Sequence, residues 1–149
     1  MTMTKSQMRE AVLEAKATRR MTWEAIAEQV GCSPVFVCAT CLGEHSMTDD
    51  QARALGEVLG LGKDVIRALT ECPTKAQQGE ALMTDPLVYR FKEIGMVYGE
   101  SVKQIVHEKF GDGIMSAIDF TLDVDRVEDP KGDRVQITMT GKFLPYKRW

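Results

Sequence analysis

The chain has 149 residues, of which 28% are charged and 44% hydrophobic, and its formal net charge is −3. This composition is typical of a soluble globular protein of one domain or two small ones. The negative charge argues against a general binder of nucleic acid or anionic membranes. No apolar run approaches the roughly 20 residues of a membrane-spanning helix. The N-terminus lacks the apolar segment of a signal peptide, so we expect a cytoplasmic protein with reduced cysteines.

The first half of the chain has the pattern of short amphipathic helices. Apolar residues at helical spacing predict a helix over roughly residues 4–20. A second helix is expected between a cap at Thr22 and a stop at Gly31. A third begins at Ser33, as cap, with a proline at its first position, and ends at Gly43.

Two more helices complete this half. Thr48 and Gln51 form a capping box that opens the fourth helix. A fifth helix is expected over Asp64 to Glu71. Together the five helices predict an all-helical bundle, and we place the first domain at residues 1–80.

The second and third helices are joined by a short turn and resemble a helix-turn-helix, so a DNA-binding regulator is one reading of this sequence. The helix after Ser33 would then enter the major groove. It has no basic residue, and only Thr40 could contact a base edge. Residues 1–80 hold nine Lys and Arg against eleven Asp and Glu, whereas DNA affinity comes from neutralising phosphates. The sequence therefore argues against a nucleic-acid partner.

The cysteines include one CxxC pair, Cys38 and Cys41, with Cys32 upstream and Cys72 further along. A structural zinc site needs four ligands, usually from two such pairs. A redox CxxC motif belongs near a βαβ pattern, which this sequence lacks. We interpret these cysteines as small buried thiols and expect no metal.

The second half begins with residues 73–84, which lack periodicity and are interpreted as a linker; we place the second domain at residues 81–149. Asp85 and a following proline open a helix whose apolar stripe runs to Tyr98. Ser101 and Gln104 have the spacing of a capping box and predict a further helix that stops at a glycine.

A hairpin is expected at the end of the chain. One strand covers Ser116 to Val127, a turn covers 128–133, and a second strand returns through Val135 to Gly141, each with alternating apolar residues. An isolated two-stranded hairpin is marginal in water, so its apolar face requires a partner, and a second copy of the chain is the expected one. The predicted fold class is α+β, an all-helical bundle followed by a helix-plus-hairpin domain that associates with a second copy of the chain.

Three polar residues of this second half are candidates for chemistry. Arg90 and Glu93 are three residues apart and are therefore neighbours on a helix surface. The same spacing is typical of an exposed ion pair that contributes little to stability. Ser116 follows a glycine turn on the predicted buried face, so it is either a satisfied core serine or part of a site. His45 and His107 are interpreted as surface or supporting groups.

The run HEKFGDGIMSAIDF and the preceding TDPLVYRFKEIGMVYGESVKQIV resemble cyanase, the cyanate hydratase or cyanate lyase family. The resemblance covers nearly the whole chain and is densest from Asp85 to Trp149. It implies a bicarbonate-dependent decomposition of cyanate to ammonia and carbon dioxide, through a carboxy-carbamate intermediate and carbamate. The role implied is cyanate detoxification and nitrogen supply. The family's helical domain is similar to repressor DNA-binding domains and serves packing.

The same resemblance implies site residues and partners. It implies that Arg90, Glu93 and Ser116 are catalytic. It implies a substrate-binding role for three more residues: Ile114, Ala117 and Leu144. Cyanate and the co-substrate bicarbonate are the implied small-molecule partners, with no metal and no organic cofactor. The implied assembly is a homodecamer of five dimers with active sites between subunits.

Overall fold

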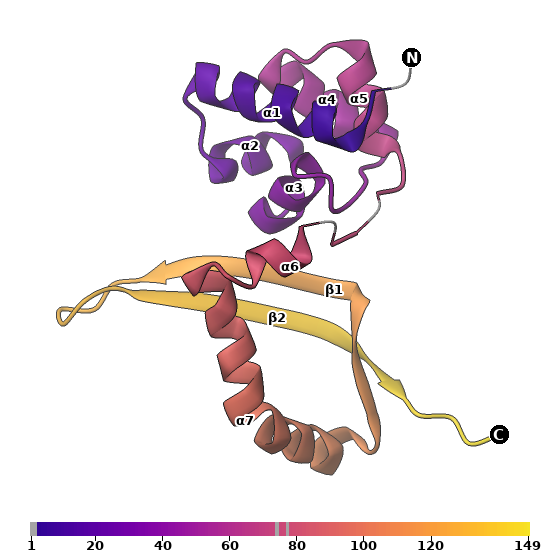
Figure 1. Cartoon of the computed structure of the whole chain (residues 1–149), viewed down its shortest axis with the longest axis vertical. Coiled ribbons are helices and arrows are strands. Elements are labelled where there is room, and N and C mark those ends of the chain that lie inside the picture. Colours follow the sequence, from indigo (N-terminus) through magenta and orange to yellow (C-terminus); the bar gives the residue numbers. More distant parts are fainter. Residues whose placement is uncertain (1–2, 74, 77) are drawn as a thin grey trace. The chain divides into compact units, whose positions relative to one another are not determined.

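The computed structural model describes residues 3–73, 75–76 and 78–149. The helices of the first half form a bundle (Figure 1) and are α1 (Lys5–Arg19), α2 (Trp23–Val30), α3 (Pro34–Cys41), α4 (Asp49–Leu59) and α5 (Lys63–Thr70). The second half contains α6 (Gly79–Leu82), α7 (Pro86–Phe110), β1 (Gly113–Val127) and β2 (Arg134–Pro145). The two strands pair in one sheet. This order confirms the predicted fold class.

Side-chain caps and glycine stops set the limits of the bundle helices. The hydroxyl of Thr48 accepts a hydrogen bond from the backbone N–H of Gln51, whose side chain accepts one from the Thr48 N–H, so the predicted capping box is confirmed. Thr22 caps α2 as predicted, and α2 ends at Gly31, which has a φ of 77°. These caps and the glycine end provide hydrogen-bond partners for backbone groups that a helix end leaves unpaired.

Ser33 differs from its prediction in one respect. It occupies the N-cap position of α3, but its side chain makes no capping hydrogen bond. Its hydroxyl instead faces two acceptors of β1, the carbonyl oxygen of Leu122 and a carboxylate oxygen of Asp123, each 3.1 Å away. The turn between α2 and α3 therefore contacts the hairpin.

The hydrophobic core lies in the helical bundle. Among the described residues, every buried apolar side chain falls between Met8 and Leu69. The fully buried large ones come from several helices: Met8, Val12, Ile26, Val37, Leu55 and Leu69. Bundle stability therefore rests on packing of these amphipathic faces.

The described residues form two compact units, drawn from Met1–Ala76 with Leu122–Thr138 and from Gln77–Thr121 with Met139–Trp149. The hairpin contributes to both units. The predicted boundary at residue 80 stays a prediction, because these units follow contacts rather than sequence order.

One prediction for residues 73–110 is wrong, because α7 is one continuous helix of 25 residues through Ser101 and not two helices. The linker at residues 73–84 stays a prediction, and it contains the single-turn helix α6. A serine in a helix interior finds the nearby N–H groups already bonded, so it has nothing to cap. Gly95 and Gly99 each cost α7 about 1 kcal/mol, but no proline interrupts it.

The apolar faces of α7 and the hairpin are uncovered within one chain. Ile118, on the predicted buried face of β1, is 93% exposed. Large apolar side chains of α7 are exposed as well, among them Leu87, Phe91, Ile94, Val102 and Ile105. Although α7 is long, none of the helices described is both long and apolar enough to cross a membrane. The alternation that predicted a buried face is present, but the chain supplies nothing to cover it.

Cys38 and Cys41 lie on α3, and Cys41 is fully buried in the core. Burial raises the pKa of the Cys41 thiol from 9.0 to about 12 and also raises the pKa of Cys38. Within the described ranges, no three His, Cys, Asp or Glu side chains are placed to hold a metal ion. Cys41 is the buried thiol that the sequence analysis expected. Cys32 and Cys38 are only half-buried and Cys72 is exposed, so the prediction of buried thiols is wrong for Cys72.

Cys41→Ala is expected to lower the free energy of unfolding by about 1–2 kcal/mol at pH 7, because it leaves a small cavity. The unfolded thiol ionises near pH 9.0 while the folded thiol stays protonated to about pH 12. The wild-type protein therefore loses stability between these values, by up to about 1.4 kcal/mol per pH unit from this group. Urea unfolding at pH 7 and pH 10 should show a smaller alkaline loss in the variant. Equal alkaline losses in both proteins would contradict burial of this thiol.

Candidate active site

Arg90 and Glu93 lie on the second turn of α7. Asp85 fixes the helix start, since its carboxylate accepts hydrogen bonds from the N–H groups of Leu87 and Val88 at 2.8 and 3.1 Å. Arg90 Nε lies 3.3 Å from Glu93 Oε2, and the two side chains are 71% and 42% exposed. The predicted neighbour relation is confirmed, and such an open pair adds little stability. The distance of 3.3 Å is to Nε, and the largely exposed guanidinium remains accessible to another anion.

Ser116 on β1 is buried, with 6% of its surface exposed. Its Oγ accepts hydrogen bonds from the backbone N–H groups of Ile118 and Asp119, both at 3.0 Å. The hydroxyl hydrogen takes part in neither bond, so it can be donated to a ligand. Two donors on the oxygen also polarise the O–H bond toward giving that hydrogen. The Ser116 oxygen is therefore held by the backbone of β1, and whether the hydroxyl acts in a site stays a prediction.

The turn from α7 into β1 is held by side chains around His107. Its Nε2 lies 3.2 Å from the carbonyl oxygen of Gly113, and its Nδ1 lies 3.4 Å from a carboxylate oxygen of Asp112. Phe110 and Phe143 stack with ring centroids 5.2 Å apart. These contacts fix where β1 begins and give His107 the supporting position that the sequence analysis expected.

The implied substrate-binding residues lie on the two strands of the hairpin. A Cβ placed on Gly113 would lie 2.3 Å from the carbonyl oxygen of Leu144, so β2 passes close to the residue before Ile114. Ile114, Ala117 and Leu144 are all exposed.

The chain does not bring the three implied catalytic residues together. In the part of the chain that the structure describes, neither Arg90 nor Glu93 has a hydrogen bond or ion pair with Ser116. Arg90 remains open to solvent. A site that uses all three residues is therefore incomplete in a single chain.

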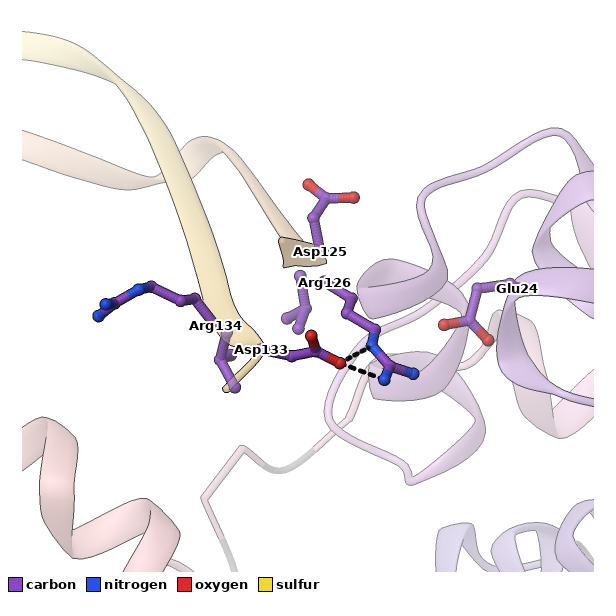
Figure 2. A pocket seen from close by; sticks show the side chains of 7 residues that line it. Glu24, Asp125, Arg126, Asp133 and Arg134 are labelled. Carbon is purple, nitrogen blue, oxygen red and sulfur yellow. Dashed lines mark hydrogen bonds and ion pairs between the residues drawn. The ribbon is translucent and has the colours of Figure 1, made fainter. Parts of the chain in front are cut away.

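A separate hollow of about 440 Å³ lies at the hairpin tip beside α2 (Figure 2). Its labelled side chains carry both charges, and Arg126 is paired with Asp133. A second ion pair joins Arg134 and Asp129 at 3.0 Å. Because these guanidinium groups already have carboxylate partners, this hollow offers no unpaired positive charge to a small anion.

Gly141 was missed as a candidate by sequence reasoning. A Cβ on this residue would lie 2.4 Å from the carbonyl oxygen of Ser116. The available signal was a glycine inside a strand, which marks a bulge or a close approach of another backbone.

The fold defines a class of protein in which a helical bundle precedes a long helix and a two-stranded hairpin, and in this chain the second part bears an arginine–glutamate pair and a buried serine. A solved structure of this class, cyanase from T. urticae, matches with a TM-score of 0.84 and 34% identity, covering 93% of this chain and 96% of that one.

Family and sequence comparisons agree with this match. Residues 5–73 match the family model described as cyanate hydratase, N-terminal, and residues 80–148 match the cyanate lyase C-terminal domain. Cyanate hydratases of Marinomonas sp. (strain MWYL1) and Teredinibacter turnerae are each 50% identical over 147 residues, which is 99% of this chain and all of theirs. The chain belongs to the cyanate lyase family of enzymes.

Proposed function

We propose that this enzyme decomposes cyanate with bicarbonate. A bicarbonate oxygen bonds to the cyanate carbon and gives a carboxy-carbamate dianion, with the bicarbonate proton passing to nitrogen. Cleavage of the bond between that oxygen and the former bicarbonate carbon releases carbon dioxide, and uptake of a proton leaves carbamate. Carbamate takes up a second proton and separates into ammonia and a second carbon dioxide. The observation that carries this proposal is the exposed Arg90 guanidinium, paired with Glu93 on α7, in a chain of this family.

Arg90 supplies the positive charge that this reaction needs. Both reactants are anions and repel each other, and the intermediate has two negative charges. A guanidinium stays charged and offers a planar pair of donors to an oxyanion. Donors fixed before the reaction stabilise charge most effectively where water is excluded. Glu93 orients Arg90 through the 3.3 Å contact to Nε.

Ser116 supplies a neutral donor. Its oxygen is held by two backbone N–H groups, so its hydrogen points to a position set by β1. We propose that this hydrogen is donated to cyanate or to the intermediate. Ile114, Ala117 and Leu144 then line the pocket, and much of the rate gain comes from holding two small reactants together.

We further propose that the working enzyme is a homo-oligomer with active sites between subunits, in the form of five dimers. Exposed apolar residues of α7 and Ile118 of β1 need a partner surface. Arg90 and Ser116 do not meet within one chain, and one Arg90 is little charge for a dianion. If several chains meet at one site, Arg90 and Ser116 come together from different chains, and more than one Arg90 faces the dianion.

No metal or organic cofactor has a part in this scheme, and bicarbonate is a co-substrate. The proposed setting is the cytoplasm, where the enzyme removes cyanate and supplies nitrogen. We propose that the helical bundle packs within the assembly and does not bind DNA, since α3 has no basic residue.

Ammonia release from cyanate tests this function. The purified protein should release ammonia rapidly when bicarbonate is present and far more slowly in buffer freed of carbon dioxide, because bicarbonate is the attacking reactant. A buffer blank corrects for spontaneous decomposition of cyanate. Ammonia release at the same rate without bicarbonate would replace this mechanism by simple hydrolysis, and no release in either buffer would reject the activity.

A further inference from the structure

We propose that Gly141 of β2 is a positioning residue for Ser116 and acts through the Ser116 backbone. The close approach of Gly141 to the Ser116 backbone is an observation on the fold, whereas its effect on catalysis rests on the proposed function of Ser116.

The requirement for glycine at this position is one of space. A Cβ on Gly141 would lie 2.4 Å from the carbonyl oxygen of Ser116 and 2.5 Å from Cγ of Met115. Side-chain carbons do not approach other heavy atoms this closely. The methionine side chain can rotate away, but the carbonyl oxygen can move only if β1 moves. Gly141 is not among the described glycines with positive φ, so backbone conformation gives no separate reason for it.

The hydroxyl of Ser116 depends on the same stretch of backbone. Its Oγ holds the N–H groups of Ile118 and Asp119, two and three residues ahead. Displacing the Ser116 carbonyl turns the peptide that leads to those N–H groups, so the hydrogen bonds and the direction of the free hydroxyl hydrogen change together. The space left by Gly141 therefore sets where Ser116 donates.

A glycine inside a strand weakens the strand, because it adds unfolded-state entropy and packs no side chain. Gly113 shows the same close approach on the opposite strand, with its Cβ position 2.3 Å from the carbonyl oxygen of Leu144. Each glycine thus lies against the backbone of a residue implied in the site. Gly62 provides a contrast, because a Cβ there meets nothing within 4 Å and its φ is −70°.

The test compares Gly141→Ala, Gly62→Ala and Ser116→Ala in the full chain. We expect kcat/KM for ammonia release to fall about 30-fold or more in Gly141→Ala, because small misplacements of catalytic groups have effects of this size. Gly62→Ala should stay within about twofold of wild type. The molar mass of the assembly should be unchanged in all three. Adding Gly141→Ala to Ser116→Ala should cost little further activity, since coupled residues are not additive.

Amide hydrogen exchange gives a readout that does not depend on activity. The N–H groups of Ile118 and Asp119 should exchange faster in Gly141→Ala and to a similar extent in Ser116→Ala, and at the wild-type rate in Gly62→Ala. This measurement judges the contact even if wild-type protein releases no ammonia from cyanate, a result that would reject the proposed function alone.

Three results would overturn the inference. The first is wild-type exchange at both amides in Gly141→Ala. The second is full recovery of activity when Met115→Ala is combined with Gly141→Ala, because the obstruction would then be the methionine side chain. The third is loss of assembly in Gly141→Ala that persists in that combined variant, which would make Gly141 a residue for assembly.

Discussion

Arg90→Lys should lower kcat/KM for cyanate by about 100-fold or more and leave the fold unchanged. Lysine keeps the positive charge but loses the planar pair of donors and the Nε contact to Glu93, 3.3 Å long in the wild type. Losing one donor aimed at a developing oxyanion typically costs about 100–1,000-fold in rate. Because the side chain is 71% exposed in the chain, little stability depends on it.

Arg53→Lys is the matched control for this experiment. Arg53 also lies on a helix surface, 3.4 Å from a carboxylate oxygen of Asp50 three residues away, and both side chains are largely exposed. The two variants should unfold at similar temperatures, and only Arg90→Lys should lose activity in the steady-state ammonia assay. Near-normal turnover in Arg90→Lys would remove the guanidinium from the mechanism.

Mixing two inactive variants should restore activity if the site is shared between chains. Arg90→Ala and Ser116→Ala each remove one group, so an assembly of one type has no complete site. If a site takes one Arg90 from one chain and Ser116 from another, random co-assembly at equal amounts completes about one site in four, and a site that also needs the Arg90 of a third chain is completed about one time in eight. We therefore expect about an eighth to a quarter of wild-type activity after the mixture is dissociated in mild denaturant and reassembled.

The control is the same mixture without dissociation, which should stay inactive. Light scattering and helical circular dichroism recorded during dissociation should show that activity disappears with molar mass, while the α1–α5 bundle remains folded. A monomer with full specific activity would reject the shared site, and so would a reassembled mixture as inactive as its parents. The three residues would then have to converge within one chain.

Local chemistry was sufficient to predict the helical bundle. The box of Thr48 and Gln51 and the stop at Gly31 each depend on hydrogen bonds or backbone angles within a few residues, and the structure confirms them. The capping box predicted at Ser101 is wrong for a reason that the local pattern does not contain. Ser101 lies inside α7, where the nearby backbone N–H groups are already bonded within the helix, so there is no N–H group for it to cap.

The candidate site could be predicted only in part. Helical spacing correctly made Arg90 and Glu93 neighbours. Alternation indicated a buried Ser116, but it did not indicate that the hydroxyl binds two N–H groups of its own strand. The approach of Gly141 to that serine joins residues 25 positions apart, and strand alternation says nothing about such a distance between strands.

Among the described residues, every buried apolar side chain lies between Met8 and Leu69, and this has a consequence for how the protein is made. The bundle can fold as each chain leaves the ribosome, in a first-order step that needs no partner. In the proposed assembly, α7 and the hairpin, which bury no apolar side chain of their own among the described residues, reach their final structure only when chains meet. Maturation is therefore at least second order in chain concentration. At low chain concentration the apolar faces of α7 and the hairpin stay exposed for longer, and aggregation and proteolysis compete with assembly during that time.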